Sequence, residues 1–370
     1  MRETRGKKAK KSRGTSLLVL ILLILIVVAG VLFVMKISEE SGKTGETGNG
    51  SQTLGTQDKP KEELKPKTLE GNERPIAFML DNNINAMPQA GLIEADLVYE
   101  IIVEGGETRL MAVMKNKEVE KIGPLRSARH YFLDYALEND AIYVHYGQSP
   151  QAKSDIKTLG ISDINGINES ETNFWRVKDR YAPHNAVTST EKIKKIIQRE
   201  DFRTTTSKGN VLNYVVEEVE LEAKKDEPKE GETEGKITNL ANKVTIPYSS
   251  YNTVKYEYDE QSKSYIRYSR NKKQVDWDTQ ENIMVKNIII TKCKNTTLND
   301  GTTKGRQTIS NIKKLDGYYI TNGKYIPITC EKTSRSGKTV YKDLEGNEIK
   351  VNDGKTFIQI CPIDSKISFE

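Results

Sequence analysis

The sequence contains few of the residue types on which many metal and nucleophilic sites depend. It has three cysteines and three histidines, without paired-cysteine spacing or an HExxH motif. It also has no GxSxG motif and no glycine-rich nucleotide or dinucleotide loop. Zinc proteins, serine hydrolases and nucleotide-binding enzymes depend on these patterns, so none of these classes is predicted. We therefore expect neither a metal nor a cofactor.

The greater part of the chain also lacks an excess of positive charge. The formal net charge is +5, but residues 1–13 carry seven basic side chains and one acid, so the remaining residues sum to −1. A nucleic-acid-binding protein would show a basic face outside such a tail. No nucleic-acid partner is therefore expected.

One long hydrophobic run is present near the N-terminus. Residues 17–35 are 19 consecutive apolar residues, and as a helix they would be roughly 28 Å long, close to the thickness of a bilayer. The alternative, a cleaved signal peptide, would have an apolar region of about 7–15 residues. Because basic residues precede the run, we predict a cytoplasmic tail at 1–16, a single-pass membrane helix at 17–35 and an extracytoplasmic remainder at 36–370.

The remaining sequence predicts an α+β protein with two domains behind a tether. Residues 36–73 are rich in Gly, Thr, Glu and Lys and are predicted to be a disordered tether. A mixed α/β domain is predicted at 74–220, a charged linker or insertion at 221–236 and a mostly β domain at 237–370. From hydrophobic periodicity and turn residues, the predicted strands are 75–80, 96–103, 108–114, 141–146, 251–258, 264–269, 287–292, 317–328, 339–342 and 356–360, and the predicted helices are 127–139, 150–160 and 188–199.

The cysteines all lie in the C-terminal third, at Cys293, Cys330 and Cys361. An exported domain permits disulfides, but an odd number leaves at least one thiol free. Each cysteine lies in an apolar or β-rich stretch, so we predict buried free thiols.

The densest group of polar residues follows the first predicted strands and comprises Asp81, Glu100, Glu104, Glu107 and Arg109. Functional residues gather where strands end in loops, so Asp81 and Glu104 are the candidate catalytic residues. Two facing carboxylates could act as acid and base on a glycosidic bond, one with its pKa raised by the other. The alternative is that these acids cap turns and pair with Arg109, itself a candidate ligand-binding residue.

A second group, Arg126, Ser127 and Arg129, lies at the predicted start of the helix at 127–139. Free N–H groups and two guanidinium groups there would hold a carboxylate or phosphate of a wall polymer. The alternative is that Ser127 caps the helix and Arg129 pairs with an acid.

The other candidate ligand-binding residues lie in loops or at strand ends: His145, Ser149, Trp175, Arg176, His184 and Asn185. Trp175 and the residues near it offer stacking and hydrogen bonds to a sugar or peptide, although a tryptophan in a core is the alternative. Ser149 is also explained as a helix cap, because Pro150 follows it.

Many short segments match one family in the same order: RPIA (74–77), DN (81–82), PQAGL (88–92), ADLVYE (95–100), VEGG (103–106), GPLRSAR (123–129), GQSPQA (147–152), APHN (182–185), NGK (322–324), IPI (326–328) and GKT (354–356). Together they resemble the YerB-like family, which is named for a bacterial protein classed as a lipoprotein and has no known function. The resemblance covers most of 74–370 and implies a two-domain extracytoplasmic protein. This sequence departs from the family in lacking the lipobox cysteine and in having Asn83 where histidine is expected.

Two functional hypotheses follow. In the first, the chain is held at the membrane by residues 17–35 and binds a cell-wall glycan, which the acids would cleave or remodel. In the second, it is a non-enzymatic scaffold that binds another envelope protein. The sequence does not decide whether the chain is an enzyme.

Overall fold

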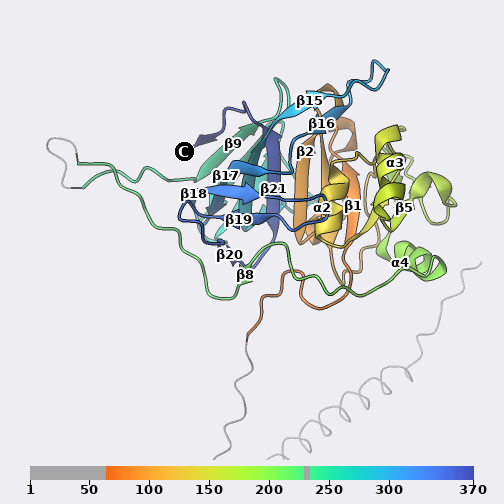
Figure 1. The fold of residues 1–370 in the computed structure, drawn as a ribbon, viewed down its shortest axis with the longest axis horizontal. Coiled ribbons are helices and arrows are strands. Elements are labelled where there is room, and N and C mark those ends of the chain that lie inside the picture. The colour runs from red at the N-terminus through yellow and green to blue at the C-terminus, as the bar shows by residue number, and fades with distance from the viewer. Residues whose placement is uncertain (1–63, 229–233) are drawn as a thin grey trace, which may run out of the picture. The chain divides into compact units, whose positions relative to one another are not determined.

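A ten-stranded mixed sheet runs through both halves of the chain in the computed structural model, which describes residues 64–228 and 234–370 (Figure 1). In spatial order its strands are β19 (Val340–Lys342), β18 (Lys324–Glu331), β17 (Lys314–Thr321), β14 (Asn287–Cys293), β21 (Thr356–Pro362), β2 (Leu97–Ile102), β3 (Thr108–Met114), β1 (Ile76–Asp81), β4 (Ile142–His145) and β5 (Asp163–Asn165).

Within the described ranges, a second sheet and three α-helices complete the main architecture. The second sheet has the order β12 (Lys272–Lys273), β11 (Ser264–Ser269), β10 (Thr253–Asp259), β9 (Lys243–Pro247) and β22 (Ser368–Phe369), with β13 (Met284–Val285) paired to β11. The helices are α2 (Phe132–Glu138), α3 (Pro150–Leu159) and α4 (Thr190–Arg199). Three strand pairs lie outside these sheets: β15 (Asn295–Thr297) with β16 (Gln307–Ile309), β20 (Val351–Asn352) with β8 (Tyr214–Val215), and β6 (Trp175–Arg176) with β7 (Ala186–Val187).

Strand β21 joins the two halves of the main sheet. It pairs in parallel with β2 on one side and with β14 on the other, so that Thr356 lies opposite both Leu97 and Asn287. The N-terminal region is mixed α/β and the C-terminal region is rich in β-structure, as predicted. Their strands nevertheless form one continuous hydrogen-bonded sheet.

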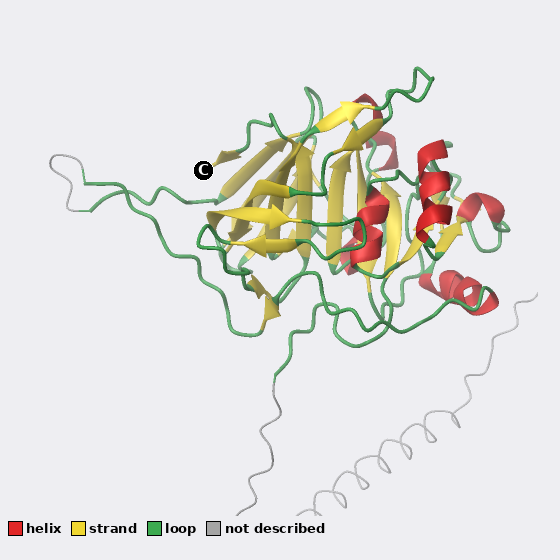
Figure 2. Ribbon diagram, in the orientation of Figure 1, coloured by secondary structure: helices red, strands yellow, loops and turns green. Residues whose placement is uncertain are grey.

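Alternating side chains of the main sheet build two hydrophobic cores. Ala77 and Met79 of β1 pack with α2 and α3, whereas Phe78 and Leu80 point to the opposite face and pack with α4 and the second sheet. Figure 2 shows the three helices gathered at one end of the main sheet, around β1, β4 and β5. The carboxyl end of β1 is thereby fixed from both faces.

Several predicted elements are confirmed. The strands at 108–114 and 264–269 match β3 and β11. Helix α3 begins after the cap Ser149 and ends at Gly160, and α4 buries the three isoleucines of its apolar stripe, Ile193, Ile196 and Ile197. The prediction of buried free thiols is also confirmed at all three cysteines.

Three predicted elements are wrong in extent. The helix expected from 127 begins at Phe132, because the backbone amides of Arg126 and Ala128 bond to Met79 and Gly147 instead. The strand expected at 317–328 is two strands, β17 and β18, separated by an Asn322–Gly323 turn with φ angles of 47° and 72°. The tether expected to run to residue 73 ends earlier, because Thr68 bonds to Asp353.

The predicted cytoplasmic tail at 1–16, the membrane helix at 17–35 and the tether up to residue 63 lie outside the described residues. Among the helices that the structure does describe, none is long and apolar enough to cross a membrane.

Candidate functional site

Asp81 is the centre of a polar cluster at the carboxyl end of β1. It is 3% exposed. Its Oδ2 is hydrogen-bonded to His184 Nδ1 at 2.7 Å and forms an ion pair with Arg126 Nε at 3.1 Å. Its Oδ1 accepts from the backbone N–H of Asn83 at 3.1 Å. A buried carboxylate therefore holds Arg126 and His184, both partly exposed, in fixed positions at the surface.

Glu104 belongs to a neighbouring group of charges and does not face Asp81 as a free acid. It pairs with Arg129 Nε at 2.5 Å and with Arg109 Nη2 at 3.7 Å. Burial would raise the pKa of Glu104, but the hydrogen bond from Arg129 and the charges of both arginines outweigh it, so this pKa is lowered. A general acid needs a raised pKa, so Glu104 is unsuited to that role.

Arg109 is the buried member of this second group. Burial, and then the charge of Arg129, lower the pKa of Arg109 to about 10. Its Nη1 donates to the backbone carbonyl of Ser127. In the Arg126 to Arg129 segment Arg129 does pair with an acid, but Ser127 does not cap a helix, because α2 begins at Phe132 with Tyr131 before it.

The acid that does share a site with Asp81 is Glu107. The turn between β2 and β3 places it there, with Gly105 and Gly106 at φ angles of 65° and 75° that favour glycine. Asn83 Nδ2 donates to Glu107 Oε1 at 3.2 Å while its backbone N–H bonds to Asp81, so Asn83 lies between the two carboxylates. Burial raises the pKa of Glu107 and the charge of Asp81 adds to it, whereas Arg270 opposes them.

Beside Arg270 the surface is hollowed. The cavity measures about 220 Å³, and its lining residues are Ile84, Met87, Pro88, Ser269, Arg270, Lys272, Lys273, Gln274 and Val275. Ser269 Oγ, Arg270 Nε and Gln274 Oε1 are buried and have no hydrogen-bond partner among the described residues. Buried polar atoms are nearly always paired, so these three atoms, on residues that line the hollow, are exceptions.

We call the group formed by Asp81, Asn83, Glu107, Arg126, His184 and Arg270, with the adjoining hollow, the strand-end site. The loop that carries His184 is braced by Asn185, which donates to the carbonyls of Val177 and Arg180. Arg176 is exposed, bonds to Asn185 Oδ1 at 2.6 Å and stacks on Tyr146. Trp175, in β6, is half-buried beside them.

Three other predicted residues have structural contacts instead. His145 is fully buried, with Nδ1 2.7 Å from the Gly147 carbonyl and Nε2 3.0 Å from Asp163. Ser149 caps α3 by accepting from the backbone N–H of Ala152. Ser127 Oγ donates to the carbonyl of Tyr146. In the described ranges, no three His, Cys, Asp or Glu side chains are grouped to hold a metal ion.

Sequence reasoning missed the part of the site that comes from the C-terminal region. Arg270 and Glu107 are 163 residues apart in the chain and form an ion pair. The available signal was that the predicted strand at 264–269 ends directly before Arg270. Nothing in the sequence shows that this strand end meets the turn after β2.

Comparison with known proteins identifies the family. Two family models match, "Protein of unknown function (DUF3048) N-terminal domain" at residues 63–203 and "Protein of unknown function (DUF3048) C-terminal domain" at residues 244–358. "Putative lipoprotein YerB" of Bacillus subtilis (strain 168) is 29% identical over 310 residues, which cover 81% of this chain and 84% of that protein. The crystal structure of YerB protein from Bacillus subtilis matches with a TM-score of 0.68 and 27% identity, over 80% of this chain and 94% of that one. The chain belongs to the YerB-like family of two-domain proteins.

Proposed function

We propose that this chain is an extracytoplasmic protein of the bacterial cell envelope, held at the membrane, that binds a cell-wall glycan at the strand-end site. The observation that carries the proposal is the hollow beside Arg270, with three buried polar atoms that lack a protein partner. Sugars offer hydroxyl groups as both donors and acceptors around apolar C–H faces. Ser269, Arg270 and Gln274, which carry these atoms, line the hollow together with the apolar Ile84 and Met87.

The location is supported separately. A relative that covers most of the chain is named a lipoprotein, and the run at 17–35 predicts an anchor with the remainder outside. As a flexible coil, the tether predicted at 36–73 would span roughly 31–37 Å. The folded part would then be within reach of the wall layer.

The charges around the site favour binding over cleavage. Asp81 is held by two basic partners and Glu104 by two arginines. Burial raises the pKa of Glu107, whose carboxylate bonds to Arg270 and Asn83. If the bound glycan is also hydrolysed, Glu107 is the acid that the geometry supplies.

The test is co-sedimentation of the full chain with purified cell-wall polymer. Ser269→Ala and Lys273→Glu alter the hollow, and Lys157→Glu, an exposed change on α3, is the matched control. Loss of one hydrogen bond worth about 1 kcal/mol should weaken binding about fivefold. Fragment release is measured in parallel with Glu107→Gln. The proposal fails if the wild-type chain stays in the supernatant or if all three variants bind equally.

The alternative, a non-enzymatic scaffold, is favoured by one observation beside the site. Tyr181 is 89% exposed, three residues before His184, and Ile84 and Ile167 are more than half exposed. Under this alternative Tyr181→Ser abolishes capture of an envelope protein partner in cross-linking on intact cells, while co-sedimentation with wall polymer is absent in the wild type.

A further inference from the structure

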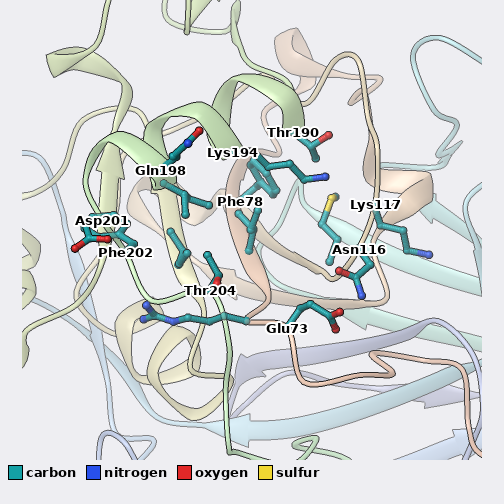
Figure 3. A pocket seen from close by; sticks show the side chains of 15 residues that line it. Glu73, Phe78, Asn116, Lys117, Thr190, Lys194, Gln198, Asp201, Phe202 and Thr204 are labelled. Atoms are coloured by element: carbon teal, nitrogen blue, oxygen red, sulfur yellow. The ribbon is translucent and has the colours of Figure 1, made fainter.

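A separate pocket of about 500 Å³ lies between α4 and the main sheet (Figure 3). It adjoins the amino end of β1, whereas the strand-end site is at the carboxyl end of that strand. Its apolar lining consists of Ile76, Phe78, Met114, Ile142, Ile197 and Phe202. The volume is within the range of about 300–1,000 Å³ that is typical of ligand pockets.

One stripe of α4 forms the wall of this pocket. Thr190, Lys194, Ile197 and Gln198 have the i, i+4, i+7, i+8 spacing of a single helix face, and all four line it. After the helix the chain turns back, and Phe202 bonds to the carbonyl of Ile197. Of the apolar lining, Ile76 and Phe202 are partly exposed, whereas Phe78 and Ile142 are buried beneath the helix.

The pocket is continuous in its lining with a polar hollow of about 380 Å³, because Glu73, Asn116 and Lys117 line both. Figure 3 shows these three residues together on one side of the pocket, with Phe78 near its centre. Lys117 pairs with Asp96 at 3.4 Å, and Lys194 pairs with the exposed Glu118. Such ion pairs near the surface contribute little, so both ammonium groups can turn to an anion.

We propose that this pocket binds the hydrocarbon chain of a membrane lipid with an anionic headgroup. The chain would lie against Ile76 and Phe202, the partly exposed members of the apolar lining, where burial of each methylene group is favourable. The headgroup would meet Lys117 and Lys194 at the polar side.

The part of the chain outside the described residues points to a lipid as the occupant. The undescribed N-terminal part ends at residue 63, ten residues before Glu73 on the rim, and it includes the predicted membrane span at 17–35. Given the membrane anchoring proposed above, on which the choice of a lipid rests, the tether predicted at 36–73 keeps the pocket on the same chain as a membrane span, so membrane lipids are amphipathic molecules within its reach. This inference does not depend on glycan binding, which uses other residues.

The experiment uses the full chain in lipid nanodiscs and two probes with a photoreactive diazirine in the acyl tail, palmitic acid and phosphatidylglycerol. Ile76→Trp fills the pocket. Lys194→Glu reverses one charge at its rim, and Lys195→Glu is the matched control, since Lys195 is exposed on the same helix outside the lining. After irradiation, mass spectrometry locates the labelled peptides.

In the wild type we expect labelling within residues 72–80 and 190–205, reduced about tenfold by Ile76→Trp, about threefold by Lys194→Glu and unchanged by Lys195→Glu. Labelling by either probe supports the proposal. The probe that labels more strongly shows whether the bound hydrocarbon belongs to a free fatty acid or to a phospholipid. The proposal is overturned if neither probe labels these peptides. It is also overturned if Lys194→Glu and Ile76→Trp are both labelled as strongly as the wild type. A thermal unfolding scan confirms that Ile76→Trp is folded.

Discussion

Arg267 and Glu100 form an ion pair that is fully buried, so each charge depends on the other for its stability. Both side chains are 0% exposed and their atoms Nη2 and Oε2 are 2.5 Å apart. The other oxygen of Glu100 accepts from Asn82 and Thr108. Arg267→Met would leave the carboxylate buried without its cation, and we expect unfolding free energy to fall by about 3–5 kcal/mol in urea titrations. Combining it with Glu100→Gln should restore part of that loss, and equal losses in the single and double variants would contradict the argument.

Lys355 makes stability depend on pH. Its Nζ donates to the carbonyls of Leu92, Ile93 and Ala95. Burial lowers the pKa of Lys355 from 10.5 to about 8. A depressed pKa in the folded state contributes stability that is present above pH 10.5 and is lost as the pH falls through 8.

The unfolding free energy of the wild type minus that of Lys355→Met should therefore increase as the pH rises from 7 to 10. Urea titrations at several pH values measure it, and subtraction removes the titration of groups that both proteins share. A difference that is constant with pH would show that the Lys355 ammonium is not desolvated.

Among the helices, α3 shows which structure is encoded locally. Ser149 as cap, Pro150 in the first turn and Gly160 at the end specify it without help from distant residues. Ser149→Ala should lower the unfolding free energy by about 1 kcal/mol, because one backbone N–H loses its acceptor. Ser149→Asp should keep the cap. Binding to wall polymer should be unaffected in both variants, whereas a weakened Ser149→Asp protein would restore Ser149 as a ligand-binding residue.

Elements that depend on distant partners are the ones that sequence patterns placed wrongly. The periodicity at 127–139 is helical, but the backbone of Arg126 and Ala128 is held by β1 and by Gly147. The same limit applies to the site. Asp81 and His184 follow recognisable strand and loop signals, while the contact of Glu107 with Arg270 depends on how the second sheet packs. Local signals therefore predict which polar residues lie at strand ends and in loops, and not which of them meet.

At the scale of the whole molecule, the order of the strands in the main sheet joins the two regions of the chain. β21 comes late in the chain and lies at the centre of the main sheet, between β2 and β14. Without it the hydrogen-bonding edge of β2 would be exposed, which favours aggregation. The two regions matched by separate family models therefore depend on each other for a complete sheet.

We accordingly predict that both regions unfold in one transition. The two tryptophans are natural probes, with Trp175 in β6 of the first region and Trp277 in the second. Trp277 also packs under Arg180, 3.4 Å from the ring centroid. In Trp277→Phe the remaining Trp175 reports the first region, and in Trp175→Phe the remaining Trp277 reports the second region together with its contact with Arg180. Each variant is titrated with urea, and fluorescence and circular dichroism are recorded on the same sample. The two signals should give the same midpoint. A lower midpoint for Trp277 fluorescence alone would mean that the second sheet unfolds while the sheet containing β21 persists.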